Sequence, residues 1–337
     1  MTIHTTYSLK NYNSFAIDAC AERFVEVFSL DDLSAVLREN HPKMLILGGG
    51  SNMLFTGDYP GFVVKIGILG KDIIQETDTD IILKIGAGES WHSLVTYCVE
   101  NDYAGIENLG LIPGTVGAAP IQNIGAYGVE LKDVFESLEY VDSRTHDLKT
   151  LTKDDCQFGY RDSIFKHQLR GNAIITSVSI RLKKSKIPEH TSYKDVQSEL
   201  AIQNVTTPTI RDVFDAVCAI RKRKLPDPIE IGNAGSFFKN PTISHAQFLD
   251  LLLLHPEIPH YSQSNSDEKI PAAWLIEQCG WKGKRLGEVG VHPNQALVLV
   301  NYGGAKGSEI IDLAYEIQAS VLEKFSIKLE MEVNIIQ

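Results

Sequence analysis

The sequence lacks several patterns that would assign it to common classes of metalloprotein or redox protein. Its five cysteines include no C-x-x-C pair, and its ten histidines occur without an H-E-x-x-H spacing. These absences argue against a zinc site or a dithiol redox centre. The cysteines are odd in number and widely spaced, so we expect them to be reduced and partly buried; they are Cys20, Cys98, Cys156, Cys218 and Cys279.

Long apolar runs are also absent. No stretch approaches the ~18 apolar residues of a membrane span, and the N-terminus has no basic segment followed by an apolar core. We therefore expect a cytoplasmic protein with no membrane partner. The net charge of -11 excludes a general nucleic-acid binder, because phosphate backbones bind net basic surfaces. Any anionic ligand must be held by local basic groups.

The composition that remains is that of an ordinary globular protein. The sequence is 43% hydrophobic and 22% charged. Its 337 residues are more than a single hydrophobic core usually accommodates, so we expect two or three domains. No internal repeat or low-complexity segment interrupts it. A domain boundary is expected in the polar segment 183–208 or at the break 224–228, and the prolines favour the second.

Apolar periodicity predicts strands alternating with helices. Helices are expected after Ser29, from Trp91 to Cys98, from Thr209 to before Pro226, from Pro271 to Cys279 and from Ser308. Strands are expected at residues 23–28, 43–47, 62–66, 81–85, 138–141, 174–182, 296–300 and 327–333. The segment 113–128 contains too much glycine and proline for a regular element, so it is predicted to be a loop.

Two glycine-rich segments are candidates for binding phosphate. The first, Gly48 to Asn52, follows a predicted strand, and successive backbone N–H groups in such a turn can surround an oxyanion. It does not fit the Rossmann fingerprint, whose third glycine would fall at Met53. A structural turn is the alternative, but the second glycine-rich segment, 113–128, favours a large phosphate-bearing ligand. Residues 303–308 lack the G-K-[ST] of a P-loop and are predicted to be a turn before a helix.

Three further residues are candidates for chemistry. Ser236 lies in a glycine-flanked turn shortly after the basic run 221–224, where a structural turn and a site are equally compatible with the sequence. Arg161 offers a planar fork suited to a carboxylate or a developing enolate, with a salt bridge to Asp162 or another acid as the alternative. Glu332 is a third candidate, with a solvated strand residue as its alternative.

Six motifs occur in order along nearly the whole chain. They are Gly48-Gly49-Gly50-Ser51-Asn52, Gly105-Ile106-Glu107-Asn108-Leu109, Ile112-Pro113-Gly114-Thr115-Val116-Gly117, Gln122-Asn123-Ile124-Gly125-Ala126-Tyr127-Gly128, Tyr160-Arg161-Asp162-Ser163 and Gly235-Ser236-Phe237-Phe238-Lys239-Asn240-Pro241. Together they closely resemble the UDP-N-acetylenolpyruvoylglucosamine reductase (MurB) family. The segment around Tyr193, with Phe158 to Arg161, looks like the form of that family with an additional tyrosine loop.

The resemblance implies an α+β fold. It implies a two-subdomain flavin module of FAD-binding type 2 (vanillyl-alcohol oxidase/PCMH-like) and a C-terminal α+β substrate-binding domain. Subdomain 1 would span 1–69, with the strand 327–337 near the site, subdomain 2 would span 70–223, and the substrate domain 224–326. FAD would be bound tightly but non-covalently, and NADPH would be the hydride donor. The implied FAD-binding residues are Gly48, Gly49, Gly50, Ser51, Asn52, Pro113, Gly114, Thr115, Gly117, Ala118, Gln122, Asn123, Gly125, Ala126 and Tyr127.

The implied activity is reduction of the enolpyruvyl group of UDP-N-acetylglucosamine-enolpyruvate to give UDP-N-acetylmuramate, a precursor of peptidoglycan. Arg161 would bind the substrate carboxylate, Glu332 would assist, and Ser236 would donate a proton, with Lys239 or Asn240 as helpers. Lys224 would meet the diphosphate, and the other implied substrate contacts are Tyr193, Asn240 and Gln295. A monomer is the family expectation, with no metal and no nucleic-acid partner.

The chain departs from the family near its C-terminus, where Met331 and Asn334 replace the proline and arginine of a frequent Glu-Pro-Glu-Val-Arg segment. Glu330 competes with Glu332 for the catalytic position, and the valine that follows Glu332 favours Glu332. Two other functions are compatible with the fold: a flavin enzyme acting on a small alcohol or sugar, and a catalytically silent sugar-nucleotide binder. The glycine segments hold no histidine for covalent flavin attachment, which weakens the first.

Overall fold

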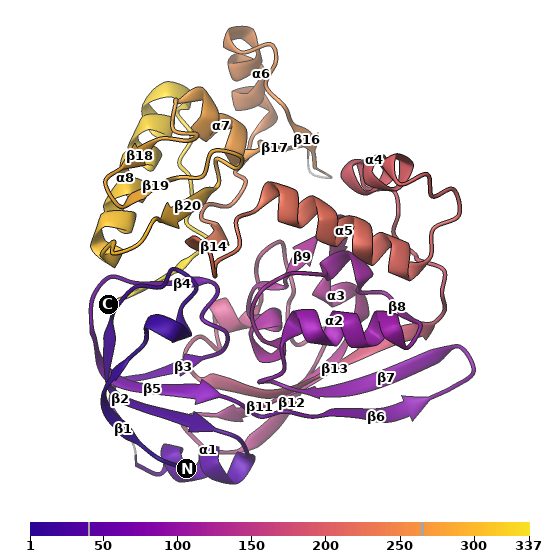
Figure 1. The fold of residues 1–337 in the computed structure, drawn as a ribbon, viewed down its shortest axis with the longest axis vertical. Helices are drawn as coiled ribbons and strands as arrows, with labels where there is room; N and C mark the ends of the chain where they lie inside the picture. Colours follow the sequence, from indigo (N-terminus) through magenta and orange to yellow (C-terminus); the bar gives the residue numbers. More distant parts are fainter. Residues whose placement is uncertain (40, 264–265) are drawn as a thin grey trace. The chain divides into compact units, whose positions relative to one another are not determined.

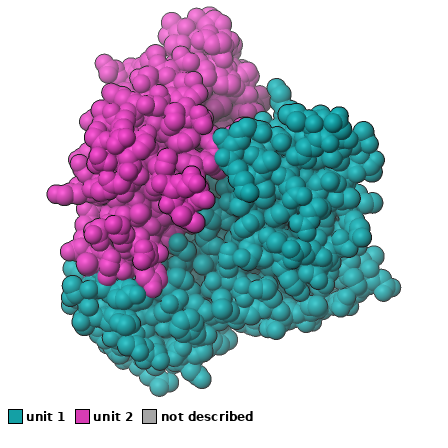
Figure 2. Space-filling model, viewed as in Figure 1, with its two compact units in different colours: residues 1–7, 21–49, 60–223 teal, residues 8–20, 50–59, 224–337 magenta. Residues whose placement is uncertain are grey.

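The computed structural model describes residues 1–39, 41–263 and 266–337. These residues form two compact units, which Figure 2 colours separately. Unit 1 comprises residues 1–7, 21–49 and 60–223, and unit 2 comprises residues 8–20, 50–59 and 224–337. The chain therefore crosses between the units within the first glycine segment, after Gly49.

Unit 1 contains two main sheets (Figure 1). The first has the order β1-β2-β5-β3 and the second the order β12-β11-β13-β7-β6, with β8 also pairing with β13. Their strands are β1 (His4–Ser8), β2 (Cys20–Val27), β3 (Met44–Leu47), β5 (Tyr59–Ile66), β6 (Lys71–Glu76), β7 (Asp80–Gly86), β8 (Tyr103–Ala104), β11 (Phe135–Asp142), β12 (Leu148–Thr152) and β13 (Ala173–Lys184). A short ribbon pairs β9 (Gly125–Ala126) with β10 (Val129–Glu130).

Helices cover the second sheet of unit 1, and Figure 1 shows α2 and α5 above one face of it. The helical segments are α1 (Leu30–Leu37), α2 (Trp91–Glu100), η2 (Glu107–Leu109), η3 (Val116–Gln122), α3 (Leu131–Val134), η4 (Ile164–Lys166), α4 (Lys194–Ile202) and α5 (Ile210–Lys224). One core joins Leu94 and Cys98 of α2 to Ile81 and Leu83 of β7. A second core packs α4 against α5.

Unit 2 is built on the sheet β14-β20-β19-β18. A smaller sheet has the order β15-β17-β16, and β21 pairs in parallel with β4. The elements are η1 (Lys10–Tyr12), β4 (Met53–Phe55), β14 (Gly232–Ser236), β15 (Thr242–Ile243), α6 (His245–Leu254), β16 (Tyr261–Ser262), β17 (Glu268–Lys269), α7 (Ala272–Gln278), β18 (Arg285–Leu286), β19 (Val289–Val291), β20 (Val298–Asn301), α8 (Gly307–Phe325) and β21 (Asn334–Ile336).

Local signals predicted several helix ends correctly. The Ser29 hydroxyl accepts the N–H of Asp32 and caps α1. Thr209 and Asp212 form the predicted reciprocal cap of α5, because the Asp212 carboxylate accepts both the N–H and the hydroxyl of Thr209. Gly280 adopts the left-handed conformation just after α7, with φ of 75°.

The predicted strand at residues 327–333 is wrong. The apolar alternation is real, since Ile327, Leu329 and Val333 are buried, but the segment forms only an isolated bridge between Met331 and Phe238. No strand among the described residues forms a ladder with this segment, and β21 begins only at Asn334.

The predicted loop at 113–128 also contains regular structure, namely η3 and β9. Pro120 lies within η3, a tight helix of a kind that is used in short pieces. Among the described residues, all five cysteines are free, and Cys98 and Cys156 are buried. No helix of the described chain is long and apolar enough to cross a membrane.

Candidate active site

The two glycine-rich segments meet in unit 1. A Cβ atom on Gly49 would lie 2.6 Å from the Gly114 Cα, and one on Gly48 would lie 2.7 Å from the Thr115 Oγ1. Gly117 is equally confined, because its Cβ would lie 2.5 Å from the Cβ of Ala87. The glycines are therefore required for close backbone packing. The same packing brings the two predicted cofactor segments together.

Asn123 connects the second glycine segment to the turn that carries Arg161. Its side chain is fully buried, and its backbone is left-handed, with φ of 43°, at the end of η3. The Asn123 Nδ2 donates to the Glu130 Oε2 and to the Gly159 carbonyl, both at 3.0 Å, while Oδ1 accepts the Lys132 N–H at 3.0 Å. These three hydrogen bonds fix Asn123, a predicted cofactor-binding residue, to the residues around it.

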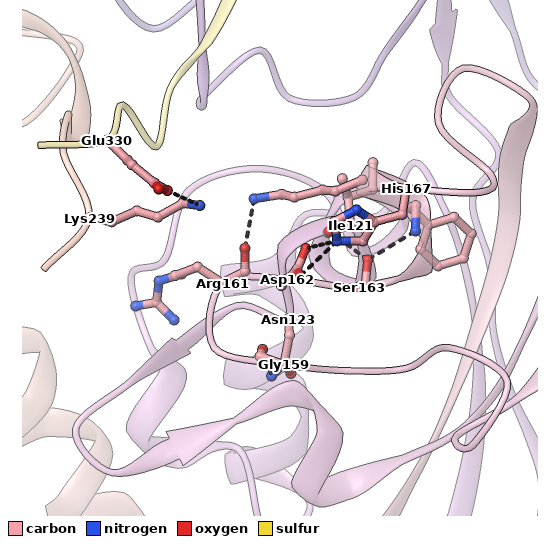
Figure 3. Close-up of polar contacts among 11 residues, drawn as sticks. Ile121, Asn123, Gly159, Arg161, Asp162, Ser163, His167, Lys239 and Glu330 are labelled. Atoms are coloured by element: carbon pink, nitrogen blue, oxygen red, sulfur yellow. Dashed lines mark hydrogen bonds and ion pairs between the residues drawn. The ribbon is translucent and has the colours of Figure 1, made fainter. Parts of the chain in front are cut away.

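Arg161 lies in a tight turn between Gly159 and Asp162 (Figure 3). Its Nη2 donates to the Gly125 carbonyl at 2.7 Å, so the guanidinium reaches the second glycine segment. The Asp162 carboxylate contacts the His167 imidazole at 2.8 Å, and this contact contributes to holding the pKa of Asp162 below its ordinary value despite partial burial. The structure thus gives Asp162 a partner other than its neighbour Arg161.

Unit 1 also contains a cluster of aromatic and cationic side chains, formed by Tyr127, Tyr193, Arg221 and Arg161. Tyr193, which precedes α4, meets Tyr127 edge to face, with ring centroids 5.5 Å apart. Burial raises the pKa of Tyr127, and the Arg221 guanidinium hydrogen-bonds to its hydroxyl and opposes that rise. The Arg221 Nε is buried and has no hydrogen-bond partner among the described residues. Burial lowers the pKa of Arg221, and the nearby charge of Arg161 adds to this effect. Two neighbouring guanidinium groups favour an anionic ligand here.

The sequence indicated Arg221 only as part of the basic run 221–224 and indicated no separate role for Asn108. Arg221 occurs four residues after the buried Val217 on α5, so helical periodicity already placed it on the inward face. The Asn108 Nδ2 donates to the carbonyls of Tyr127 at 3.1 Å and of His190 at 3.0 Å. Asn108 therefore connects the segment before Tyr193 to the second glycine segment by hydrogen bonds. No local sequence pattern predicts this role.

Ser236 ends β14 in unit 2, beside a backbone irregularity. Gly235 has φ of 68°, and the strand register shifts between Asn233 and Ser236. The Asn233 Oδ1 accepts the Gly235 N–H at 2.9 Å, and the fully buried Phe237 follows Ser236. A bulge of this kind redirects a side chain at the end of a strand, which explains the glycine before Ser236.

Glu332 lies beside the Ser236 segment. Its N–H donates to the Phe237 carbonyl at 2.8 Å, and its carbonyl accepts the Asn52 Nδ2 at 3.2 Å. Glu330 instead pairs with Lys239 at 3.2 Å, and its side chain is 70% exposed (Figure 3). Within unit 2, the Glu332 main chain therefore contacts the Asn52 side chain and the residue that follows Ser236.

The remaining predicted substrate residues occupy different positions. Lys224 is exposed at the end of α5. The Asn240 Oδ1 accepts the Ala272 N–H at 2.9 Å at the start of α7. The Gln295 Oε1 accepts the Leu297 N–H at 3.3 Å, and the Leu297 carbonyl in turn accepts the Phe237 N–H at 2.8 Å. Gln295 is thus linked through two residues to the Ser236 segment.

Comparisons with known proteins identify the family of the chain. The "FAD binding domain" family matches residues 21–150, and "UDP-N-acetylenolpyruvoylglucosamine reductase, C-terminal domain" matches residues 227–336. The UDP-N-acetylenolpyruvoylglucosamine reductase of Flavobacterium johnsoniae is 50% identical over 337 residues, which cover 100% of both chains. The chain belongs to the UDP-N-acetylenolpyruvoylglucosamine reductase family. The reductase of Amoebophilus asiaticus is also 50% identical over 340 residues, again with 100% of both chains covered.

The family fold is also present in a solved structure, that of the UDP-N-acetylenolpyruvylglucosamine reductase (MurB) from Thermus caldophilus. The TM-score is 0.69 at 22% identity, and the match covers 100% of this chain and 98% of that one. The predicted fold class, a flavin module followed by a reductase C-terminal domain, is therefore confirmed.

Proposed function

We propose that the protein uses NADPH to reduce the enolpyruvyl group of UDP-N-acetylglucosamine-enolpyruvate, giving UDP-N-acetylmuramate for peptidoglycan synthesis. The full-length identity of 50% to a reductase of that name carries this proposal. The grouping of Arg161, Arg221, Tyr127 and Tyr193 supports it, because the substrate carries a carboxylate and a diphosphate.

The glycine segments fit FAD, because successive backbone N–H groups in glycine turns can surround phosphate oxygens. Neither segment holds a histidine or cysteine, which favours non-covalent binding. The FAD-binding residues are those predicted from the sequence. FAD, when bound, relays a hydride from NADPH to the enolpyruvyl double bond.

Arg161 binds the substrate carboxylate and stabilises the negative charge that develops on it. Its planar fork suits a carboxylate, and the Gly125 carbonyl at 2.7 Å orients one nitrogen. Glu332 assists as a hydrogen-bonding partner, held by the Phe237 carbonyl and the Asn52 amide.

Ser236 donates the proton that completes reduction of the double bond. The Gly235 bulge and the buried Phe237 fix the backbone on both sides of the hydroxyl. Lys239 and Asn240, the expected helpers, have contacts with Glu330 and Ala272 instead, so the donor geometry rests on the main chain.

Lys224, Asn240, Gln295 and Tyr193 contact the rest of the sugar nucleotide, with Lys224 on the diphosphate. The T-shaped contact of Tyr193 with Tyr127 supports the form of the family that has an additional tyrosine loop. The protein acts as a cytoplasmic monomer, with flavin subdomains at 1–69 and 70–223 and a substrate domain at 224–326. The C-terminal segment 327–337 would lie near the site.

The first test is the visible absorption spectrum before and after anaerobic addition of NADPH. A flavin band that bleaches, and returns when the enolpyruvyl sugar nucleotide is added, supports the proposal. A protein that takes up no FAD refutes the redox function and favours a silent sugar-nucleotide binder.

Ser236→Ala tests the proton donor. We expect stopped-flow absorbance to show nearly intact flavin reduction and reoxidation by the sugar nucleotide slowed about 100-fold or more, the usual scale of general acid catalysis. Equal slowing of both half-reactions contradicts the assignment.

A further inference from the structure

The turn that carries Arg161 holds a backbone conformation that arginine rarely adopts. Arg161 has φ of 52°, in the left-handed region. The Gly159 and Asp162 main chains pair across the turn, with N–O distances of 3.0 and 3.3 Å. A non-glycine residue in this region is strained and persists only where its surroundings hold it.

Lys166 supplies one such restraint. Its Nζ donates to the carbonyl of Arg161 itself at 2.8 Å. A hydrogen bond from an ammonium group is stronger than one between neutral groups. The restraint therefore acts on the peptide whose orientation the left-handed conformation sets.

The backbone from which Lys166 extends is itself fixed. Lys166 ends η4, whose first turn is capped by the Ser163 hydroxyl accepting the Phe165 N–H at 3.3 Å. The same hydroxyl donates to the Ile121 carbonyl at 2.7 Å, and the Phe165 ring is buried. Lys166 thus transmits the rigidity of a packed segment to the Arg161 carbonyl.

The restraint matters for the guanidinium. With the Arg161 peptide held, Nη2 reaches the Gly125 carbonyl at 2.7 Å. Released from Lys166, the peptide can rotate toward an ordinary φ and carry the side chain away from this position.

We propose that Lys166 is a positioning residue for Arg161: its ammonium holds the Arg161 carbonyl and so keeps the guanidinium aimed at the substrate carboxylate. This inference rests on the proposed role of Arg161. It assigns a function to a lysine that contacts the arginine backbone and takes no part in proton or hydride transfer.

The test compares Lys166→Met, which keeps the length of the side chain but removes the ammonium, with the milder Lys166→Gln. Lys84→Met is the matched control, since Lys84 is also half-buried and its ammonium lies 2.8 Å from Glu139 in the sheet. We expect both Lys166 variants to lose about ten-fold in kcat/KM for the sugar nucleotide, the scale of one charge-assisted hydrogen bond. Flavin reduction by NADPH should stay within about two-fold of the wild-type rate, and Lys166→Arg should restore most of the loss.

A double-mutant cycle with Arg161→Lys separates positioning from general stability. If Lys166 acts through Arg161, adding Lys166→Met to Arg161→Lys lowers kcat/KM by less than about two-fold more. Independent, multiplying losses overturn the proposal. So do Lys166 variants that match Lys84→Met, or that slow both half-reactions equally.

Failure of the proposed function has a different signature. If Arg161→Lys alone keeps full turnover, or if the wild-type protein does not reduce the sugar nucleotide, the role of Arg161 is wrong, and the positioning role of Lys166 fails with it. If Arg161→Lys is crippled while Lys166→Met is not, only the positioning role fails.

Discussion

Asn123→Asp should destabilise unit 1 strongly and in a pH-dependent way. The change preserves the shape of the side chain and the acceptor for the Lys132 N–H. It removes the Nδ2 hydrogen bonds to the Gly159 carbonyl and to the Glu130 Oε2. It also places a carboxylate oxygen 3.0 Å from the Glu130 Oε2, on a side chain at position 123 that is fully buried. A like charge so close raises the pKa of the introduced aspartate.

The magnitude follows from these contacts. Leaving the Gly159 carbonyl without its donor costs about 1 kcal/mol. Two carboxylates about 3 Å apart repel by about 5 kcal/mol at an effective dielectric constant of about 20. Proton uptake limits the charge effect, because protonating an aspartate of ordinary pKa at about pH 7 costs about 4 kcal/mol. Lys132, whose ammonium lies 2.7 Å from the Glu130 Oε2, weakens the repulsion further. We expect a total loss of about 3–5 kcal/mol near pH 7.

The sign of the pH dependence follows from linkage. The aspartate introduced at position 123 would have a folded pKa above its unfolded value, so the destabilisation is present above the unfolded pKa and fades as the pH falls toward it. Between about pH 7 and pH 5 the loss should shrink by about 2–3 kcal/mol.

Urea unfolding of the apoprotein at both pH values measures these losses, with amide hydrogen exchange on β11 and β13 to isolate unit 1. Asn101→Asp is the control, because the exposed Asn101 amide makes a single side-chain bond to the Tyr97 carbonyl at 2.8 Å. It should cost no more than about 1 kcal/mol. A loss below about 1 kcal/mol near pH 7 for Asn123→Asp, or a loss that grows as the pH falls, would refute the reasoning.

Two further predictions concern stability and thiol reactivity. Gly307→Ala should lower the free energy of unfolding of unit 2 by about 2 kcal/mol or more, because the new Cβ would lie 1.7 Å from the Phe55 carbonyl oxygen. The control Gly57→Ala has open space around the new Cβ and should stay within about 1 kcal/mol of wild type in urea unfolding. Equal losses for the two variants would contradict this prediction. Burial raises the pKa of Cys156 to about 12, so a thiol reagent near pH 8 should label it only after unfolding. Rapid labelling of Cys156 itself in the folded protein, located by peptide mapping, would contradict this.

Short-range signals predicted most elements of the fold because their physical causes lie within a few residues. The Ser29 cap, the Thr209–Asp212 pair and the buried stripe of α8 each depend on neighbours on the same turn or helix face. The segment 327–333 misled the same reasoning. Its alternation correctly predicted which side chains are buried, but a strand also needs a partner, which its own residues do not specify.

In the candidate site, too, some properties follow from the sequence and others only from the tertiary structure. The sequence alone determined which residue types are available at the candidate positions, since glycine without Cβ, a planar guanidinium and a hydroxyl in a glycine turn have properties that depend on residue type. Only the tertiary structure decided which residues these contact. Gly49 packs on Gly114, and the Glu332 N–H donates to the Phe237 carbonyl. The Arg161 guanidinium donates to the Gly125 carbonyl, and the Arg161 carbonyl accepts the Lys166 ammonium. Most of these contacts join residues that are distant in the sequence, and the Lys166 contact depends on the unusual φ of Arg161. Geometry of that kind arises from the packing of the whole unit, which no local pattern encodes.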